Sequence, residues 1–191
     1  IIIALLIILS VTIYTYFKNG SEKKMGDNEL EDHLKVFIGT DEDNSIQNQF
    51  SELVQTVCTS IQAVNSEYES AVYILHFENN QFLLQNGSST KYFDKIHSDV
   101  MLANKLFSQE KSQLFKQNEY SSCFDAFFGE KQWSGSECII GSRIMYKDHP
   151  VGIILVYSDH FSKIQNRDLN IIRYNGNFLT LGMTKIDKIE S

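Results

Sequence analysis

The sequence predicts an α+β domain in which an antiparallel sheet is framed by two long helices. Two observations carry this prediction. Apolar residues recur every three and four positions in 44–66 and again from residue 161 onward, which is typical of amphipathic helices. Between these segments, β-branched and aromatic runs stand on either side of short polar turns, which is typical of hairpins. With 191 residues, 42% of them hydrophobic, the chain has material for one core and an appendage.

The first 17 residues, "IIIALLIILSVTIYTYF", carry no charge, and Lys18, Lys23 and Lys24 follow them. A helix of this length rises about 25 Å, slightly less than the roughly 30 Å hydrocarbon core. We expect 1–17 to be a transmembrane helix whose N-terminal part precedes Ile1. A signal peptide would need a small-residue cleavage site, which is missing here, and a buried core helix would normally carry a polar face.

Residues 18–43 are polar and acidic, and we expect them to form a solvated linker. Only "LKVFIG" interrupts this polar run, and the alternative to a linker is a short helix that carries a partner-docking patch. The lysines behind the apolar segment favour a globular domain on the cytoplasmic side. The expected location is therefore the inner (cytoplasmic) membrane, with a single pass.

The globular part opens with "DNSIQNQFSELVQTVCTSIQAVNS", whose apolar residues form one helical stripe. Cys58 lies in that stripe, so we expect a buried, inert thiol. Two strands follow, "AVYILHF" and "QFLLQ", joined by the turn residues 78–80. Residues 91–111 fit one or two short helices, and "SQLFKQ" predicts a brief strand.

Residues 117–137, "QNEYSSCFDAFFGEKQWSGSE", have no clean period but are rich in aromatic side chains. A long connection of this kind is either folded over a cavity or docked on a partner.

Two further strands, "ECIIGSRIMY" and "VGIILVYS", are separated by "KDHP". Pro150 is expected to close the turn, since proline is tolerated in a turn or at the first residue of a strand. The run behind it is apolar at nearly every position, as in a central strand covered on both faces, and Gly152 would let a neighbour approach its backbone. In the closing helix, Gly176 and Gly182 are expected to permit close packing or to mark a kink.

The stretch "ECIIGSRIMYKDHPVGIILVYSDHFSKIQNRDLNIIRY" resembles the terminal signature of GAF domains, with Phe161 and Asp168 before the last helix. The similarity covers residues 44–191. It implies an antiparallel sheet of five or six strands, with the N- and C-terminal helices on one face and the short helices and the 117–137 loop on the other. It also implies a ligand pocket under that second layer and pairing of the terminal helices between two copies.

The chain departs from the family pattern at several points. Gly141 or Ser142 stands where the family often has a proline in the penultimate strand. The residue pattern of cyclic-nucleotide-binding members cannot be placed, and no cysteine stands in a bilin attachment motif. The resemblance therefore implies no particular ligand.

Charge and motif spacing exclude several function classes. A net charge of −7 argues against a nucleic-acid partner. The five histidines lack metal-ligand spacing, and the glycines form no phosphate-binding loop, so we expect neither a metal nor a cofactor. The three cysteines form no CxxC motif or Cys-and-His ligand cluster and are odd in number, which favours a reducing compartment.

The candidates for ligand or partner binding combine aromatic, thiol and charged side chains. Arg143 could meet an anionic ligand or face solvent, and Trp133 could line a pocket, anchor a partner or serve as a lid. His97 could contact a ligand or lie at an exposed helix end. The candidates are His97, Cys123, Phe124, Phe127, Trp133 and Arg143.

Because no output domain follows the module in this sequence, we expect a noncatalytic, membrane-anchored GAF-like scaffold or regulatory subunit of a bacterial-type envelope assembly. It would act through protein contacts. The first alternative is a small-molecule sensor whose ligand binds beneath 117–137 and alters helix pairing or partner binding. An enzyme of the sulfoxide reductase type would rest on Cys123 and Cys138 alone.

Overall fold

The computed structural model describes residues 27–38, 44–89, 91–130 and 132–190. The expected transmembrane helix at 1–17 and residues 18–26 and 39–43 of the expected linker lie outside the described residues. No helix in the described ranges combines the length and the apolar character that a membrane crossing requires.

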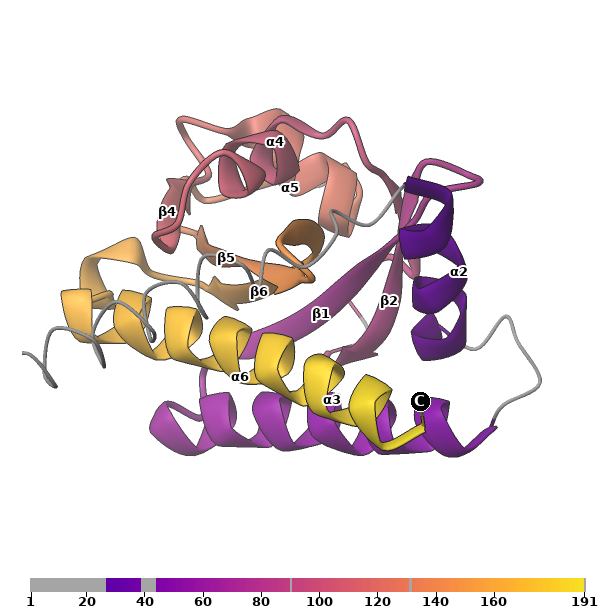
Figure 1. Ribbon diagram of the computed structural model, residues 1–191. Coiled ribbons are helices and arrows are strands. Elements are labelled where there is room, and N and C mark those ends of the chain that lie inside the picture. Colours follow the sequence, from indigo (N-terminus) through magenta and orange to yellow (C-terminus); the bar gives the residue numbers. More distant parts are fainter. Residues whose placement is uncertain (1–26, 39–43, 90, 131, 191) are drawn as a thin grey trace, which may run out of the picture.

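The described residues form an α+β fold on a curled antiparallel sheet, as predicted, with strand order β3-β2-β1-β6-β5-β4 (Figure 1). Its six strands are β1 (Glu69–His76), β2 (Gln81–Gly87), β3 (Lys95–His97), β4 (Gln113–Lys116), β5 (Cys138–Tyr146) and β6 (His149–Ser158).

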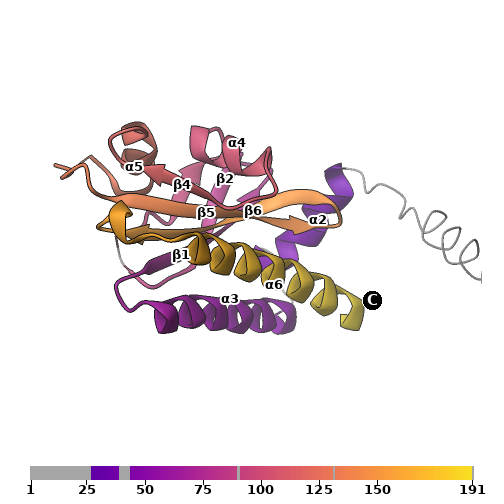
Figure 2. The same ribbon diagram turned by 90° about the vertical axis from the view of Figure 1, so that its left-hand side faces the viewer.

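Helices cover both faces of the sheet. They are α2 (Asp27–Ile38), α3 (Asn44–Val64), α4 (Met101–Phe107), α5 (Ser121–Phe128) and α6 (Asn166–Glu190), with a 3-10 turn at Phe161–Lys163. The long helices α3 and α6 lie under one face, while α4 and α5 lie over the other (Figure 2). Each face has its own cluster of buried apolar residues, so the sheet is the middle of three layers.

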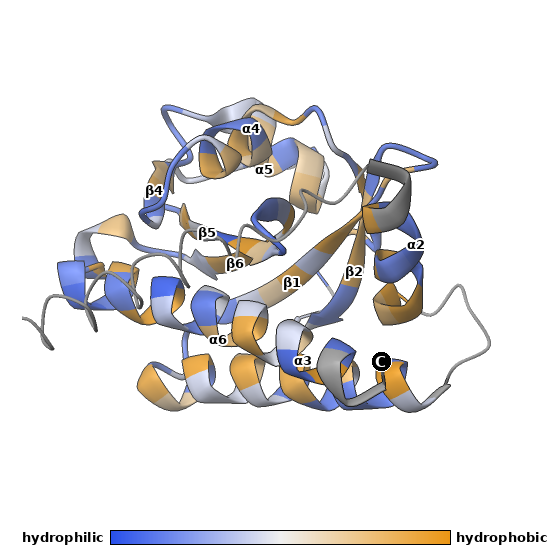
Figure 3. Ribbon diagram, viewed as in Figure 1, coloured by the Kyte–Doolittle hydropathy of each residue, from blue (hydrophilic) through white to orange (hydrophobic). Residues whose placement is uncertain are grey.

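Strand β6 is central because both of its edges pair, with β1 on one side and β5 on the other. Every residue from Val151 to Ser158 is buried, which confirms the central strand expected from the apolar run. The neighbouring β1 is largely apolar, whereas β2 contains both apolar and polar residues and is mostly half-buried (Figure 3).

Three glycines allow neighbouring backbones or side chains to approach closely. A Cβ on Gly152 would lie 2.5 Å from the Tyr73 carbonyl oxygen, and one on Gly176 would lie 2.9 Å from the Arg143 carbonyl oxygen. A Cβ on Gly182 would overlap Leu53 of α3. Close packing is thus confirmed at all three positions, and α6 runs through Gly176 and Gly182 as one helix.

The prediction that Pro150 closes the β5–β6 turn is wrong. Pro150 lies within β6, opposite Met145. The turn consists of Lys147 and Asp148, which both have positive φ, at 45° and 64°. Pairing between β6 and β1 ends at Gly152, so Pro150 stands where β6 has no β1 partner and its missing N–H breaks no such bond. A register shift lies beside it, and Met145 N donates to Thr180 Oγ1 of α6 at 3.0 Å.

Residues 27–38 do not form the solvated linker that we expected. They form helix α2, so the short helix of the alternative is present, and it packs into the core of the domain itself. Leu30, Leu34 and Phe37 are at most 2% exposed and recur at helical spacing. The Phe37 ring lies 5.3 Å from that of Phe50 on α3 and 5.7 Å from that of Tyr146 on β5. Acidic and other polar residues stand between these three positions in the sequence, so the narrow apolar face that α2 buries against the domain was not recognised from composition.

A polar cluster ties α2 to the end of α6. Asp187 Oδ1 lies 3.0 Å from His33 Nδ1 of α2, and Asp187 Oδ2 lies 3.2 Å from Lys147 Nζ in the β5–β6 turn. Burial opposes ionisation of Asp187, but hydrogen bonds from Tyr146 and Lys147 and the charge of Lys147 hold the pKa of its carboxyl below the usual value.

Asp187→Asn is expected to lower the free energy of unfolding by about 1 to 2 kcal/mol at neutral pH, because it removes the charge that these donors face. The lowered pKa means that the carboxylate stabilises the fold above the ordinary aspartate value of 3.8 and loses this effect as the pH falls through the folded-state value. Urea titrations across pH should show the free energies of unfolding of wild type and Asp187→Asn converging in acid.

Asp32→Asn, on the exposed side of α2, is the control and should change stability by less than about 0.5 kcal/mol. A difference between wild type and Asp187→Asn that stays constant down to the lowest pH would contradict the role given to the Asp187 carboxylate.

Candidate functional site

The segment 117–137 contains helix α5, which places its aromatic side chains against the sheet. Phe124 and Phe127 have no exposed surface. The Phe127 ring lies 5.7 Å from that of Tyr73 on β1, and the Phe124 ring lies 5.3 Å from that of Trp133. These rings, with Tyr92 and Phe128, form a packed group that we call the aromatic layer.

The tyrosine hydroxyls of the aromatic layer form hydrogen bonds with the backbone of the protein itself. Tyr73 OH donates to the Phe93 carbonyl at 2.8 Å, and Tyr92 OH donates to the Glu69 carbonyl at 2.7 Å. Burial raises the pKa of both hydroxyls, which therefore stay protonated donors. Both hydroxyls of this layer are thus paired with backbone carbonyl groups of the same chain.

The loop behind α5 is fixed by two carboxylates. Trp133 Nε1 donates to Asp125 Oδ1 at 3.0 Å. The Glu137 carboxylate accepts hydrogen bonds from the backbone N–H groups of Ser134 and Gly135, at 2.9 and 2.8 Å. Burial opposes the Glu137 charge, but these amides hold the pKa of its carboxyl below the usual value. The sequence offered no sign of the part played by Glu137, since its partners are main-chain groups.

All three cysteines are buried and unpaired. Cys123 lies among the buried apolar residues between α5 and the sheet, as does Ile139 of β5. Cys138 precedes Ile139 on that strand and so points to the opposite face of the sheet. Burial raises the pKa of Cys58 and Cys123, and that of Cys138 to about 12. The thiols are therefore protonated at neutral pH, and Cys123 and Cys138 do not face one another across a common space.

The two remaining candidates lie apart from the aromatic layer. His97 is exposed on the edge strand β3, opposite Gln81. Arg143 is half-buried on β5, where its Nη1 donates to the Phe107 carbonyl at 3.1 Å and its Nη2 lies 3.9 Å from Glu110 Oε1. The structure thus brings Cys123, Phe124, Phe127 and Trp133 together and leaves His97 and Arg143 at different places on the sheet.

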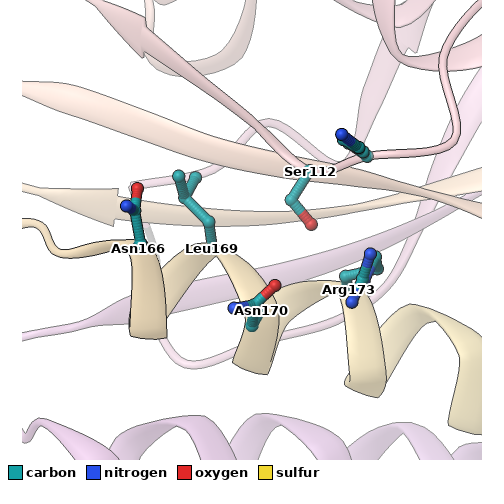
Figure 4. A pocket seen from close by; sticks show the side chains of 6 residues that line it. Ser112, Asn166, Leu169, Asn170 and Arg173 are labelled. Atoms are coloured by element: carbon teal, nitrogen blue, oxygen red, sulfur yellow. The ribbon is translucent and has the colours of Figure 1, made fainter.

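Two adjoining pockets lie along α6, where β5 extends beyond the end of β4; we call them the α6 pockets. The first has a volume of about 370 Å³ and the second about 320 Å³, and both are lined by Lys111 and Arg173. The side chains around the first pocket come from the α4–β4 connection and from the first half of α6 (Figure 4). Arg143 lines the second. Apart from Arg143, none of these residues could be recognised as a site from the sequence, because they come from distant segments.

The outer side of α6 carries exposed apolar side chains. Tyr174, Phe178 and Leu181 are 62%, 48% and 69% exposed and recur at i, i+4 and i+7, so they share one side of the helix. We call this row the α6 stripe. Its positions were not singled out from the sequence, where they could not be told from the buried positions of the same helix.

Comparison with solved structures places this architecture among known folds. A GAF domain from Acinetobacter phosphoenolpyruvate-protein phosphotransferase matches with a TM-score of 0.59 and 11% identity, over 86% of this chain and 98% of that chain. A free methionine-R-sulfoxide reductase from Neisseria meningitidis, solved with its substrate, matches with a TM-score of 0.60 and 10% identity, over 89% and 95%. A phycoerythrobilin-bound GAF domain from a cyanobacterial phytochrome matches with a TM-score of 0.59 and 9% identity, over 83% and 98%.

No family model matches the sequence. No curated protein matches it either. The likeness therefore lies in the arrangement of strands and helices, which the resemblance of residues 137–174 to the GAF terminal signature anticipated. On this basis the chain has the GAF-domain fold.

Proposed function

We propose that this protein is a noncatalytic regulatory module of the GAF fold that acts through protein contacts made by the outer side of α6. In this proposal residues 1–17 anchor it in the inner membrane and the domain lies on the cytoplasmic side. Its partners are a second copy of the chain and other proteins of a membrane-associated assembly.

The observation that carries the proposal is the α6 stripe. Three large apolar side chains on one side of a helix expose surface that association would remove from water. The spacing of Tyr174, Phe178 and Leu181 suits a helix packed lengthwise against another helix. A second α6 offers the same row, so two copies can bury their stripes against each other about a two-fold axis.

The aromatic layer supports contact rather than ligand sensing beneath 117–137. Phe124 and Phe127 fill the positions where the sensor alternative would place a ligand, and the tyrosine hydroxyls there already bond to backbone carbonyls. The raised pKa values of the three thiols support a noncatalytic role, since the thiolate is the reactive form.

Leu181→Glu is expected to weaken self-association of the full-length protein by roughly 100-fold or more, because a buried leucine contributes about 1.5 to 3 kcal/mol per subunit and the substitution sets two carboxylates close together. The measurement is sedimentation or light scattering over a range of protein concentrations, with the wild type expected to dimerise.

Met101→Glu is the matched control. Met101 is also an exposed apolar residue, at 44%, but it lies at the start of α4 on the opposite layer. This variant should associate like the wild type. A wild-type protein that stays monomeric, or equal effects of the two variants, would sink the pairing of α6 helices as the mode of contact.

A further inference from the structure

We propose that the α6 pockets form one anion site that binds the phosphate groups of a small soluble metabolite. Lys111, Arg143 and Arg173 would hold the phosphate oxygens, and side-chain amides of α6 would contact the remainder of the ligand. This inference goes beyond the contact function of the α6 stripe, and the two surfaces adjoin, because Tyr174 belongs to the stripe and also lines the second pocket.

The cations of the site converge from three separate elements. Lys111 lies in the α4–β4 connection, Arg143 on β5 and Arg173 on α6. The chain as a whole carries a net charge of −7, so a local group of three cations stands out against its surroundings. None of the ion pairs among the described residues involves Lys111 or Arg173. The Arg173 guanidinium carbon lies 5.4 Å from the centroid of the Tyr174 ring, and this contact does not neutralise its charge. The charges of Lys111 and Arg173 are therefore available to an anion from solution.

One carboxylate, that of Glu110, lines the second pocket. Its side chain is 90% exposed, and its Oε1 is 3.9 Å from Arg143 Nη2. An exposed ion pair at this distance is weak and screened by salt. Glu110 can turn to solvent when an anion enters, so it does not cancel the positive character of the site.

Neutral polar groups complete the lining. Ser112 lines the first pocket, and its buried Oγ has no hydrogen-bond partner among the described residues. A buried hydroxyl without a protein partner is rare and fits a position whose partner is water or a ligand. Figure 4 shows the Ser112 side chain directed toward α6, which contributes Asn166, Asn170 and Arg173 to the same pocket.

The dimensions and the donor types favour a small phosphate compound. Each pocket, at about 370 or 320 Å³, lies at the lower end of the range for small-molecule sites, and the shared Lys111 and Arg173 join them. A guanidinium offers paired N–H donors that match two oxygens of one phosphate, and an ammonium adds a point charge. Leu169 of the first pocket and Met145 of the second supply apolar contact for an organic part.

Titration calorimetry of the full-length protein with inorganic pyrophosphate, at fixed ionic strength, tests the site. Wild type should bind, and Lys111→Gln and Arg173→Gln should each weaken binding about tenfold, because each removes one charge-assisted contact. Arg173→Lys should fall between wild type and Arg173→Gln. Lys185→Gln removes the same charge from an exposed position of α6 outside the pockets and should leave the affinity unchanged.

Absence of pyrophosphate binding by the wild type would overturn the proposal. An equal loss of affinity in Lys185→Gln would also overturn it, because it would show that the protein attracts anions only through its general positive charge on α6. A second arm uses vesicles with phosphatidic acid, compared with vesicles of phosphatidylcholine alone. A second result is a protein that binds the phosphatidic acid vesicles but not pyrophosphate, and loses that binding in both Lys111→Gln and Arg173→Gln. This result would assign the phosphate to a lipid headgroup and overturn the proposal of a soluble ligand. Self-association of Arg173→Gln, measured as for Leu181→Glu, separates loss of this site from loss of the α6 contact.

Discussion

Phe127→Ala is expected to lower the free energy of unfolding by about 3 to 5 kcal/mol, among the largest effects of any single substitution in this chain. The Phe127 ring has no exposed surface and packs edge-on against Tyr73 in the centre of the aromatic layer. Its removal forfeits the transfer free energy of the ring and leaves a cavity bounded by other rings, which cannot collapse freely. Chemical denaturation followed by circular dichroism measures the loss.

Phe93→Ala is the matched control for Phe127→Ala, because it removes the same atoms from a side chain that is 46% exposed. It should cost about 1 kcal/mol. An apolar cavity opened by Phe127→Ala should also take up benzene and gain thermal stability from it, whereas wild type should not. Equal stabilisation of wild type by benzene would mean that the layer already holds an accessible space, which would revive the sensor alternative.

Gly152→Ala is expected to lower the free energy of unfolding by about 3 kcal/mol, the upper part of the usual range for overpacking. The added Cβ would lie 2.5 Å from the Tyr73 carbonyl oxygen and 2.7 Å from Ile74 Cδ1. Relief would require β6 to move away from β1, and Gly152 is paired with Ile74 at this point of the ladder. The sheet can accept the methyl group only by losing hydrogen bonds at its centre.

Gly87→Ala at the end of β2 serves as the comparison for Gly152→Ala. Its Cβ would meet the Ser89 carbonyl oxygen at 3.5 Å and the Ser70 carbonyl oxygen at 3.6 Å, which are ordinary contacts. The change should stay within about 0.5 kcal/mol of wild type. If thermal melts of Gly152→Ala and Gly87→Ala coincide, the close approach of β1 and β6 is not the reason for the glycine.

Periodicity predicted most of the fold because the long elements repeat their signals several times. Helices α3 and α6 each carry a sustained apolar stripe, and β1 and β6 are buried along nearly their whole length. A short helix in 18–43 was only the alternative to a linker, because Leu30, Leu34 and Phe37 stand among acidic residues and the polar composition outweighed their helical spacing. Helix α5, with 8 residues, is too short to show a period.

The candidate sites were harder to predict because each depends on contacts between distant segments. The aromatic residues of 117–137 pointed to a layer over the sheet, but their number did not tell whether the rings enclose a space or fill it. Arg143 was singled out as a possible contact for an anion, whereas Lys111 and Arg173 join it only when the α4–β4 connection is laid beside α6. No local pattern encodes that neighbourhood.

The distribution of the thiols has a practical consequence. Each is shielded and protonated in the folded domain, so a maleimide can reach it only when its surroundings open. Cys58 lies on α3 beneath one face of the sheet, Cys123 lies on α5 above the other face, and Cys138 lies on strand β5 of the sheet itself. The rates at which a mass spectrometer finds these three sites alkylated would give the order in which the layers separate, without any label having to be introduced into the chain.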